Sequence, residues 1–285
     1  MRRHADEKLL TTLLALNRAF YSIYRLVNTD IDTLIQAISD QVTVVKLRGL
    51  PFYAFQSRLR LRGFIYVSDL AQYVYCRRKF YLMYRLVNIC GKIRSIKLRR
   101  EIYRIATALG PDIQVYDEEH AKYILVGLVL HRTVQNSVEI LRDSHIKTEV
   151  EVADLDLGVV GHIDVLVCLG KNVDIIEVKS GFYRKIPDYY VVQAKLYGLL
   201  VERQLGVKPR RVLLVSSARR GYGDEDRGVF LKLHQVEYRE NDRDALLQLV
   251  RSSRRLLMEE KAPPFLRDPR RCSRCSFRIF CQYSL

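Results

Sequence analysis

The chain has 285 residues, 48% of them hydrophobic, so it can bury a sizeable core. Its 48 lysines and arginines outnumber its 32 acidic residues and give a formal net charge of +16, which favours a polyanionic partner such as nucleic acid. Residues 1–8 lack an apolar signal segment, and the longest apolar run, 123–130, is too short to span a bilayer. No GxxxxGK[ST] phosphate loop is present. We therefore expect a cytoplasmic protein that is neither a membrane protein nor a nucleotide-driven motor.

The first hundred residues are expected to be largely helical and basic. Apolar residues recur at helical spacing through 5–40, which predicts two helices with a break near 28–30. Ser68 is a candidate N-cap for a helix over 69–87 in which basic residues and tyrosines alternate, and a second basic stretch follows at 92–104. These stretches fit either a solvated helix face or a surface that tracks phosphates. The tyrosines fit either core packing or base stacking.

The second half of the chain predicts an α/β arrangement. A long helix is expected at 121–143, after which the hydrophobic period changes to two over 147–179, with glycines as breaks, as in a three-stranded meander. The remaining elements are expected to be a helix at 188–204, a strand at 211–216, a polar loop at 219–227, a strand at 229–238 and a helix at 242–260. An arginine- and cysteine-rich tail follows.

The most informative segment is the pair of alternating strands at 161–169 and 172–179. If residues 170–171 form a two-residue hairpin loop, cross-strand partners have residue numbers that add up to 341. Asp164 is then opposite Glu177. Cross-strand Cβ atoms lie about 4.5 to 5.5 Å apart, a spacing at which two carboxylates repel each other. A shared proton or a divalent cation would offset that repulsion, and oxygen ligands favour Mg²⁺ or Mn²⁺.

Lys179 completes this pattern, because it lies two residues beyond Glu177 on the same strand and face. In the same register His162 faces Lys179. An ammonium group beside a metal-binding pair of carboxylates is typical of nucleases, although a surface hairpin with ordinary charges is the alternative. Apolar neighbours indicate instead a central, buried hairpin, in which charges need a function. These neighbours are Val165, Val167, Ile175, Ile176 and Val178.

Four short motifs together resemble the RecB-like branch of the PD-(D/E)xK nucleases. They are Gly127-x3-His131, Gly161-x2-Asp164, Glu177-x-Lys179 and Gln193-x3-Tyr197. One cysteine before these motifs and three after them narrow the resemblance to the CRISPR-associated RecB-like exonuclease family, the fourth Cas family. These cysteines are Cys76, Cys272, Cys275 and Cys281. The similarity covers residues 64–285.

The resemblance implies a RecB-like α/β core with a central mixed sheet flanked by helices. The implied divisions are a helical N-terminal extension at 1–63, a helical segment at 64–120 that carries the first cluster cysteine, the nuclease core at 121–262 and a cysteine-rich cluster tail at 263–285.

The resemblance also implies roles for single residues. The ligands of a catalytic Mn²⁺ or Mg²⁺ would be His131, Asp164, Glu177 and the backbone carbonyl of Val178. Lys179 would position or activate the attacking water. Gln193 and Tyr197, one helical turn apart and therefore on one helix face, would orient the substrate.

The C-x2-C-x5-C motif at 272–281 supplies three thiolates, so a fourth ligand must come from elsewhere. The spacing alone fits zinc or an iron-sulfur cluster. The resemblance, with Cys76 as the fourth ligand, implies a 4Fe-4S cluster that attaches the tail to the helix bearing Cys76. Cys90 and Cys168 are expected to be small core residues.

Together these features predict a metal-dependent exonuclease that cleaves single-stranded DNA or single-stranded ends. The family context implies a role in CRISPR adaptation, trimming spacer precursors with the integrase proteins as partners. The sequence gives no oligomeric state. Two alternatives are a recombination or repair end-processing nuclease and a non-catalytic DNA-binding iron-sulfur scaffold. The intact set of His131, Asp164, Glu177 and Lys179 argues against the scaffold.

Overall fold

The structure is a computed structural model that describes residues 2–27, 31–38, 42–47, 50–56, 63–85, 88–90, 113–116, 118–219, 229–264, 266, 268–273, 275 and 281. The predicted basic stretch at 92–104 and nearly all of the predicted loop at 219–227 lie outside these residues. The chain divides into two compact units. The first comprises Met1–Thr29, Gly63–Ala71 and Val126–Ser252, and the second Asp30–Arg62, Gln72–Leu125 and Ser253–Leu285. The domain boundaries implied at 63, 120 and 262 stay predictions.

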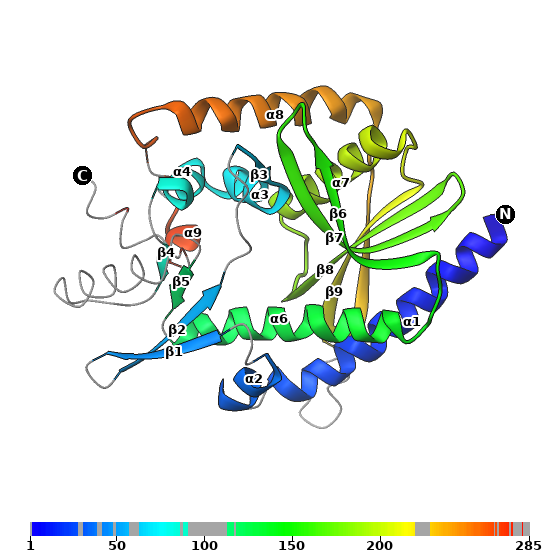
Figure 1. Cartoon of the computed structure of the whole chain (residues 1–285), viewed down its shortest axis with the longest axis horizontal. Helices are drawn as coiled ribbons and strands as arrows, with labels where there is room; N and C mark the ends of the chain where they lie inside the picture. The colour runs from blue at the N-terminus through cyan, green and yellow to red at the C-terminus, as the bar shows by residue number, and fades with distance from the viewer. Residues whose placement is uncertain are drawn as a thin grey trace. The chain divides into compact units, whose positions relative to one another are not determined.

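The first unit contains a mixed six-stranded sheet in the order β10-β9-β8-β7-β3, with β6 also paired to β7 (Figure 1). Its strands are β3 (Ile65–Tyr66), β6 (Ile146–Asp154), β7 (Val159–Leu169), β8 (Asn172–Phe182), β9 (Arg211–Arg219) and β10 (Val229–Val236). The predicted meander is confirmed as β6, β7 and β8, which pair antiparallel in chain order. Strand β9 then joins β8 in parallel, so β8 is a central strand.

Helices α1 (Arg2–Val27) and α7 (Asp188–Leu205) pack against this sheet, α1 on β7, β8 and β10, and α7 on β6, β8, β9 and β10. Helix α7 follows Pro187 and ends at Gly206, whose φ of 65° is the left-handed conformation that favours glycine at a helix end. Helix α1 buries residues at helical spacing, namely Ala5, Leu9, Leu16, Ala19 and Phe20.

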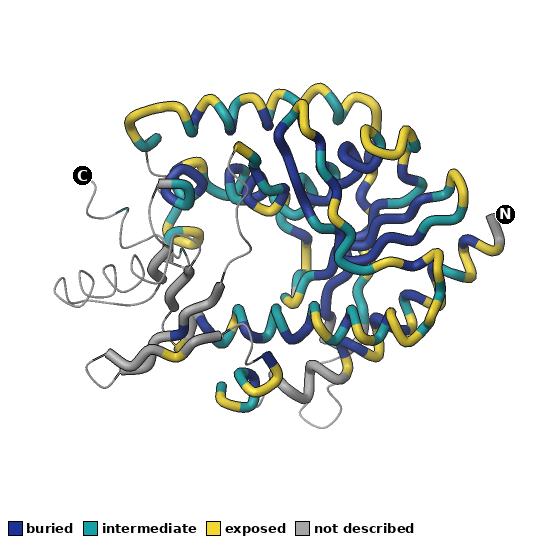
Figure 2. Tube along the Cα trace, in the orientation of Figure 1, coloured by how far each residue is buried: buried dark blue, intermediate teal, exposed yellow. Residues whose placement is uncertain are grey.

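The core of this unit is centred on β7 and β8, most of whose residues are buried (Figure 2). Ile163, Val165, Ile175, Ile176 and Val178 are all fully buried, so the prediction of a central, apolar hairpin is confirmed. Strands covered on both faces carry near-continuous apolar runs, which explains this composition. Any charged group on them is held in a largely apolar environment.

Strand β7 changes its partner along its length, and this change creates a fork. On one edge β7 pairs with β6 from Val159 to Ile163 and from Val165 to Val167, on either side of Asp164. On the other edge Val159 and Val160 pair with β3, whereas Val165–Leu169 pair with β8. Strand β8 therefore separates from β7 just before Val165, and Asp164 lies at the point of separation.

The register of the hairpin is confirmed where the ladder exists. Pairs run from Leu169–Asn172 to Val165–Ile176, as the sum of 341 predicts. The ladder then ends, so Asp164 and Glu177 are not a ladder pair, and the predicted pairing of His162 with Lys179 is wrong. His162 instead stacks on Tyr66 of β3, with ring centroids 6.4 Å apart. The alternation of side chains along the sequence does not reveal the fork, because β7 stays extended where β8 separates from it.

The second unit contains a four-stranded sheet in the order β1-β2-β5-β4. The strands are β1 (Val42–Leu47), β2 (Leu50–Gln56), β4 (Asn88–Cys90) and β5 (Ile113–Tyr116). None of them was predicted. The remaining helices of the chain are α2 (Ile31–Ala37), α3 (Val67–Tyr75), α4 (Arg77–Arg85), α6 (Glu118–Glu139), α8 (Glu240–Met258) and α9 (Pro269–Ser273). No helix in the described part of the chain is long and apolar enough to cross a membrane.

The single helix predicted at 69–87 is instead two helices, α3 and α4, that meet at Cys76. The Arg271 guanidinium donates a 2.8 Å hydrogen bond to the Tyr75 carbonyl, an acceptor that an uninterrupted helix would use itself. Tyr73 and Tyr81 of this region are 8% and 5% exposed, and the Tyr73 ring packs edge-on against Phe80. Core packing, rather than base stacking, accounts for these two tyrosines.

Candidate functional site

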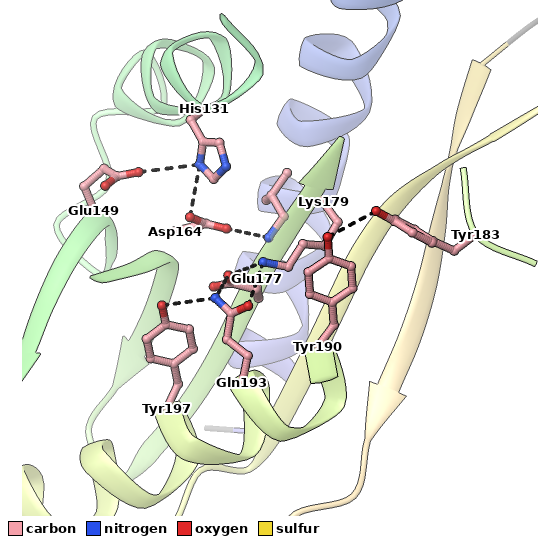
Figure 3. A network of polar contacts seen from close by, with 10 residues as sticks. His131, Glu149, Asp164, Glu177, Lys179, Tyr183, Tyr190, Gln193 and Tyr197 are labelled. Carbon is pink, nitrogen blue, oxygen red and sulfur yellow. Dashed lines mark hydrogen bonds and ion pairs between the residues drawn. The ribbon is translucent and has the colours of Figure 1, made fainter. Parts of the chain in front are cut away.

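The buried carboxylate of Asp164 is fixed at the fork between β7 and β8. Its Oδ2 accepts a 2.6 Å hydrogen bond from the backbone N–H of Val178, which has left the β7 ladder. Its Oδ1 lies 3.1 Å from Nδ1 of His131 on α6 (Figure 3). The Asp164 side chain is only 7% exposed. One carboxylate thus joins strands β7 and β8 to helix α6.

A second group of polar side chains surrounds Glu177. Its Oε1 accepts hydrogen bonds from Lys179 Nζ at 2.7 Å and from Gln193 Nε2 at 2.8 Å, and Gln193 Oε1 accepts from Lys179 Nζ at 3.1 Å. These three side chains therefore hold one another in place. The other oxygen, Oε2, is buried without a hydrogen-bond partner among the described residues. A buried carboxylate oxygen without a donor is a position that a cation can stabilise.

Tyr197 lies beyond Gln193, one turn further along α7. Gln193 Nε2 is 3.5 Å from the Tyr197 hydroxyl. The Tyr197 ring also explains the glycine of the Gly161-x2-Asp164 motif. A Cβ at Gly161 would lie 2.6 Å from Tyr197 Cε1 and 2.8 Å from Val67 Cγ2, so no side chain fits there. The motif thus allows α7 to pack closely beside β7.

The electrostatics of the site follow from burying these carboxylates together. Burial and the Asp164 carboxylate raise the pKa of Glu177 to about 8, although Lys179 opposes the shift. Burial also acts to raise the pKa of Asp164, but His131, Lys179 and the Val178 N–H outweigh it and hold that pKa below its usual value. Asp164 in turn raises the pKa of His131 to about 10. The site therefore attracts positive charge, whether protons or a metal cation.

Glu149 of β6 is a member of the site that the sequence reasoning missed. Its Oε1 lies 3.7 Å from His131 Nδ1 (Figure 3). The candidate ligand atoms of His131, Glu149 and Asp164 all lie within 4.8 Å of one another. Extending the hairpin reasoning to the β6–β7 pair would have found it, because the register that matches Val150 with Ile163 brings Glu149 opposite Asp164.

A tyrosine cluster beside Lys179 was also missed. Lys179 Nζ lies 4.6 Å from the centroid of the Tyr190 ring, which favours the ammonium group by a cation–π interaction. The Tyr190 ring packs against Tyr189 and Tyr183, with centroids 4.4 and 5.5 Å away, and the hydroxyls of Tyr183 and Tyr190 are 3.3 Å apart. Burial and Tyr183 raise the pKa of Tyr190, so its phenol stays neutral.

The structure brings together the predicted side chains of His131, Asp164, Glu177, Lys179, Gln193 and Tyr197. Val178, whose carbonyl is a predicted ligand, also lies here, because its backbone N–H donates to Asp164. All of these residues lie in the first unit. His162 lies apart from this group, beside Tyr66 and 3.5 Å from a carboxylate oxygen of Glu151.

The four predicted cluster cysteines all lie in the second unit, are all half-buried and form no disulfide in the described part of the chain. Burial raises the pKa of Cys281, the nearby Cys275 and Cys76 raise it further, and a hydrogen bond from Arg78 opposes them. Cys272 donates to the Leu266 carbonyl at 3.1 Å. Within the described residues, no three cysteine sulfur atoms lie within 4.8 Å of one another.

Two further hydrogen bonds hold the C-terminal segment beside Cys76. The Tyr75 hydroxyl donates to the Arg271 carbonyl at 3.0 Å, and Arg78 Nη1 donates to the Pro263 carbonyl at 2.8 Å. The tail is thus joined to the junction of α3 and α4 at Cys76, in the region where the sequence predicts a shared cluster.

Comparison with known proteins gives a family. A family model described as the PD-(D/E)XK nuclease superfamily matches residues 100–282, more than half of the chain. A search of the curated proteins found no match.

Two solved structures are similar to the chain. One is that of SSO0001, with 15% identity, 80% of this chain and 90% of that chain covered, and a TM-score of 0.48. The other is a protein from Eubacterium rectale named as an exonuclease, with 14% identity, 69% and 80% covered, and a TM-score of 0.35. Both TM-scores are below 0.5, so we draw nothing further from these two structures.

Proposed function

Because the chain belongs to the PD-(D/E)XK nuclease superfamily, we propose that it is a divalent-metal-dependent DNA exonuclease acting on single-stranded DNA or single-stranded ends. The observation that carries the proposal is the meeting of Asp164, Glu177 and Lys179 with His131 at the fork between β7 and β8. Apolar residues would pack better than two buried carboxylates beside a lysine, so these charged groups need a function other than packing. Their chemistry suits the hydrolysis of a phosphodiester.

The proposed ligands of the catalytic cation are His131, Asp164, Glu177 and the carbonyl of Val178. The donor set fits Mn²⁺ or Mg²⁺, since it combines carboxylate and carbonyl oxygens with one imidazole, and the buried Oε2 of Glu177 has no hydrogen-bond partner among the described residues. A divalent cation held there supplies Lewis-acid chemistry, polarising the phosphodiester and acidifying an attacking water.

The other side chains orient the reacting groups. Lys179 is held by Glu177, by Gln193 and by the Tyr190 ring, so its ammonium group is fixed beside the carboxylates. From there it can hydrogen bond to a water or to a phosphate oxygen. Gln193, which binds both Glu177 and Lys179, sets their relative positions. We assign substrate orientation to Gln193 and Tyr197.

The preference for single strands rests on the aromatic cluster of Tyr183, Tyr189 and Tyr190 beside Lys179. All three tyrosines are half-buried, and the accessible part of an aromatic ring can stack on the bases of an unpaired strand but not on paired bases. The formal net charge of +16 supports a nucleic-acid substrate in general.

We also propose that Cys76, Cys272, Cys275 and Cys281 hold a 4Fe-4S cluster. Cys275 and Cys76 lie close enough to Cys281 to raise its pKa, which supports a common site. The hydrogen bonds that attach the tail beside Cys76 support it as well. The proposed role in CRISPR adaptation, beside the integrase proteins, rests on the resemblance of the motifs and cysteines alone. Trimming of a spacer precursor by the purified protein with the integrase is its test.

The nuclease proposal is tested by Lys179→Met, which removes the ammonium group and keeps an unbranched side chain. The variant should bind single-stranded DNA as the wild type does, but cleave it about 10²- to 10⁴-fold more slowly with Mn²⁺, the range expected for loss of a group that assists proton transfer. Lys171→Met, at the exposed loop of the same hairpin, is the control and should cleave normally. A wild-type protein that binds DNA without cutting it would instead support the scaffold.

A further inference from the structure

Lys232 of β10 lies in one row with Lys179, although two strands separate their positions in the chain. The sheet register pairs Lys179 with Ser216 of β9, and Ser216 with Lys232. Residues directly opposite each other on neighbouring strands point to the same face of a sheet. Neighbouring strands are about 4.8 Å apart, so the Cα atoms of the two lysines are separated by roughly 9.6 Å. Ser216, between them, is 0% exposed, so other residues cover this row.

The chain folds back over its own strand directly after Lys179. The pair Lys179–Ser216 is followed by the pair Phe182–Ser217, so two residues of β8 have no counterpart in β9 and form a β-bulge. Gly181 lies in this bulge, and a Cβ there would lie 2.5 Å from Cζ and 2.7 Å from Cε2 of Tyr183. The glycine therefore leaves room for the Tyr183 ring to pack against the end of β8.

Lys232 holds the backbone that carries this ring. Its Nζ donates hydrogen bonds to the carbonyl of Tyr183 at 3.3 Å and to that of Arg184 at 2.8 Å. Hydrogen bonds from an ammonium group are charge-assisted and stronger than those between neutral groups. The segment is also fixed by the side chain of Ile186, which is only 7% exposed. Two consecutive carbonyls after β8 are thus attached to β10.

The contacts continue from Tyr183 to Lys179. The Tyr183 ring packs edge-on against the Tyr190 ring, with centroids 5.5 Å apart and hydroxyls 3.3 Å apart. The centroid of the Tyr190 ring lies 4.6 Å from Lys179 Nζ (Figure 3). A continuous series of contacts therefore runs from Lys232 through the two tyrosines to Lys179, and it ends in the row of the sheet in which it began.

The simpler explanation for Lys232 is the protection of a sheet edge, because β10 is the edge strand of the described sheet. A lysine with that role points into solvent and blocks pairing with another chain. Lys232 is instead half-buried and bonded to two carbonyls of a segment that contacts the site.

We propose that Lys232 is a positioning residue for cleavage. By holding the backbone at Tyr183, it keeps the Tyr190 ring over the Lys179 ammonium group. The inference rests on the proposed function, because Lys179 is the group that it positions.

The first test compares two substitutions of Lys232 in single-turnover cleavage of saturating single-stranded DNA with Mn²⁺. Lys232→Met should lower the rate about 2- to 10-fold, the factor that corresponds to the net contribution of one hydrogen bond. Lys232→Arg can still donate to both carbonyls and should restore most of the rate. The control is Lys208→Met, which removes an exposed lysine just before β9 and should cleave as the wild type does. The affinity for DNA should fall no further in Lys232→Met than in this control.

The second test asks whether Lys232 acts through the Tyr190 ring. If it does, Lys232→Met should have little further effect in a Tyr190→Leu protein, because the ring that it positions is already missing. Independent effects would multiply the two losses of rate. Multiplied losses, or a Lys232→Met protein that cleaves at the wild-type rate, would overturn the inference.

Gly181→Ala provides a variant that leaves Lys232 in place and guards against a folding defect of Lys232→Met. The added Cβ displaces the Tyr183 ring, so cleavage should slow in the wild-type background and not in Tyr190→Leu. Normal cleavage by Gly181→Ala would contradict the series of contacts. The proposed nuclease function fails on a different result, namely that the wild type does not cut DNA at any Mn²⁺ concentration.

Discussion

The backbone N–H of Val178 donates a 2.6 Å hydrogen bond to Oδ2 of Asp164, just beyond the last ladder pair of β7 and β8. A side chain thus continues the connection between the two strands where their backbones separate. The same carboxylate presents Oδ1 to His131. We therefore propose that Asp164 has a structural role through Oδ2 and a metal-ligand role through Oδ1.

Two substitutions at Asp164 should separate these roles. Asp164→Asn keeps an oxygen that can accept from Val178 but loses the charge, so cleavage should be lost while stability stays close to that of the wild type. Asp164→Ala leaves the buried N–H without an acceptor, so its free energy of unfolding should be lower than that of Asp164→Asn by about 1 to 3 kcal/mol. Urea unfolding of the metal-free proteins measures the difference. Equal stability of the two variants would show that the hydrogen bond contributes little.

The Tyr190 ring is expected to hold Lys179 in position. Tyr190→Leu removes the aromatic face that lies 4.6 Å from the Lys179 ammonium, and it should lower the single-turnover cleavage rate at saturating DNA by about 2- to 30-fold. Tyr190→Phe keeps the ring and loses the hydroxyl, with its contacts to Tyr183 and Tyr189. It should cleave nearly as fast as the wild type. If both variants were equally slow, the hydroxyl rather than the ring would be the important group.

The parts of the fold that could be predicted are those with a long hydrophobic period. Strands β7 and β8 have eleven residues each, most of them apolar, and the Gly170-Lys171 turn fixes their register. Strands β3 and β4 have two and three residues, too few for any period to be recognised. Their positions depend on which segments of the chain meet in space, which local pattern does not encode.

The candidate site shows the same division. Asp164, Glu177 and Lys179 could be found because hairpin alternation relates them directly. Gln193, Tyr197 and His131 needed the resemblance to a family, since they lie on helices whose contacts with the sheet leave no local signal. Glu149 could have been found from the register of β6 with β7, but its left-handed backbone within a strand could not.

The cysteine site makes a prediction that is independent of nuclease activity. Anaerobically purified protein should be brown, with about four irons per chain. Cys76→Ser should lose iron, because it removes the proposed ligand at the junction of α3 and α4. Cys168→Ser is the control, since Cys168 is a half-buried thiol on β7 in the other unit, and its iron content should be unchanged. Colourless wild-type protein with stoichiometric zinc would contradict the cluster and support the zinc site.

The raised pKa values of His131 and Glu177 predict that metal uptake displaces protons. Asp164 raises the pKa of His131 to about 10, while burial and Asp164 raise that of Glu177 to about 8. Both groups thus carry protons in the metal-free protein at pH 7. Since both pKa values are raised on folding, their contribution to stability is complete below the usual values of 4.5 and 6.5 and is lost as the pH rises through about 8 and 10.

A divalent cation requires the deprotonated forms of both ligands, so binding of Mn²⁺ at pH 7 should release about two protons per chain, and fewer as the pH rises through 8. The apparent affinity for Mn²⁺ should increase over the same pH range. Calorimetric titration in buffers of different ionisation enthalpy measures this release, because the observed heat changes in proportion to the protons transferred to the buffer. Asp164→Asn removes the negative charge that raises the pKa of His131. The Mn²⁺ that this variant still binds should therefore release fewer protons per ion. A heat of binding that is the same in every buffer would show that His131 and Glu177 are already deprotonated before the metal arrives.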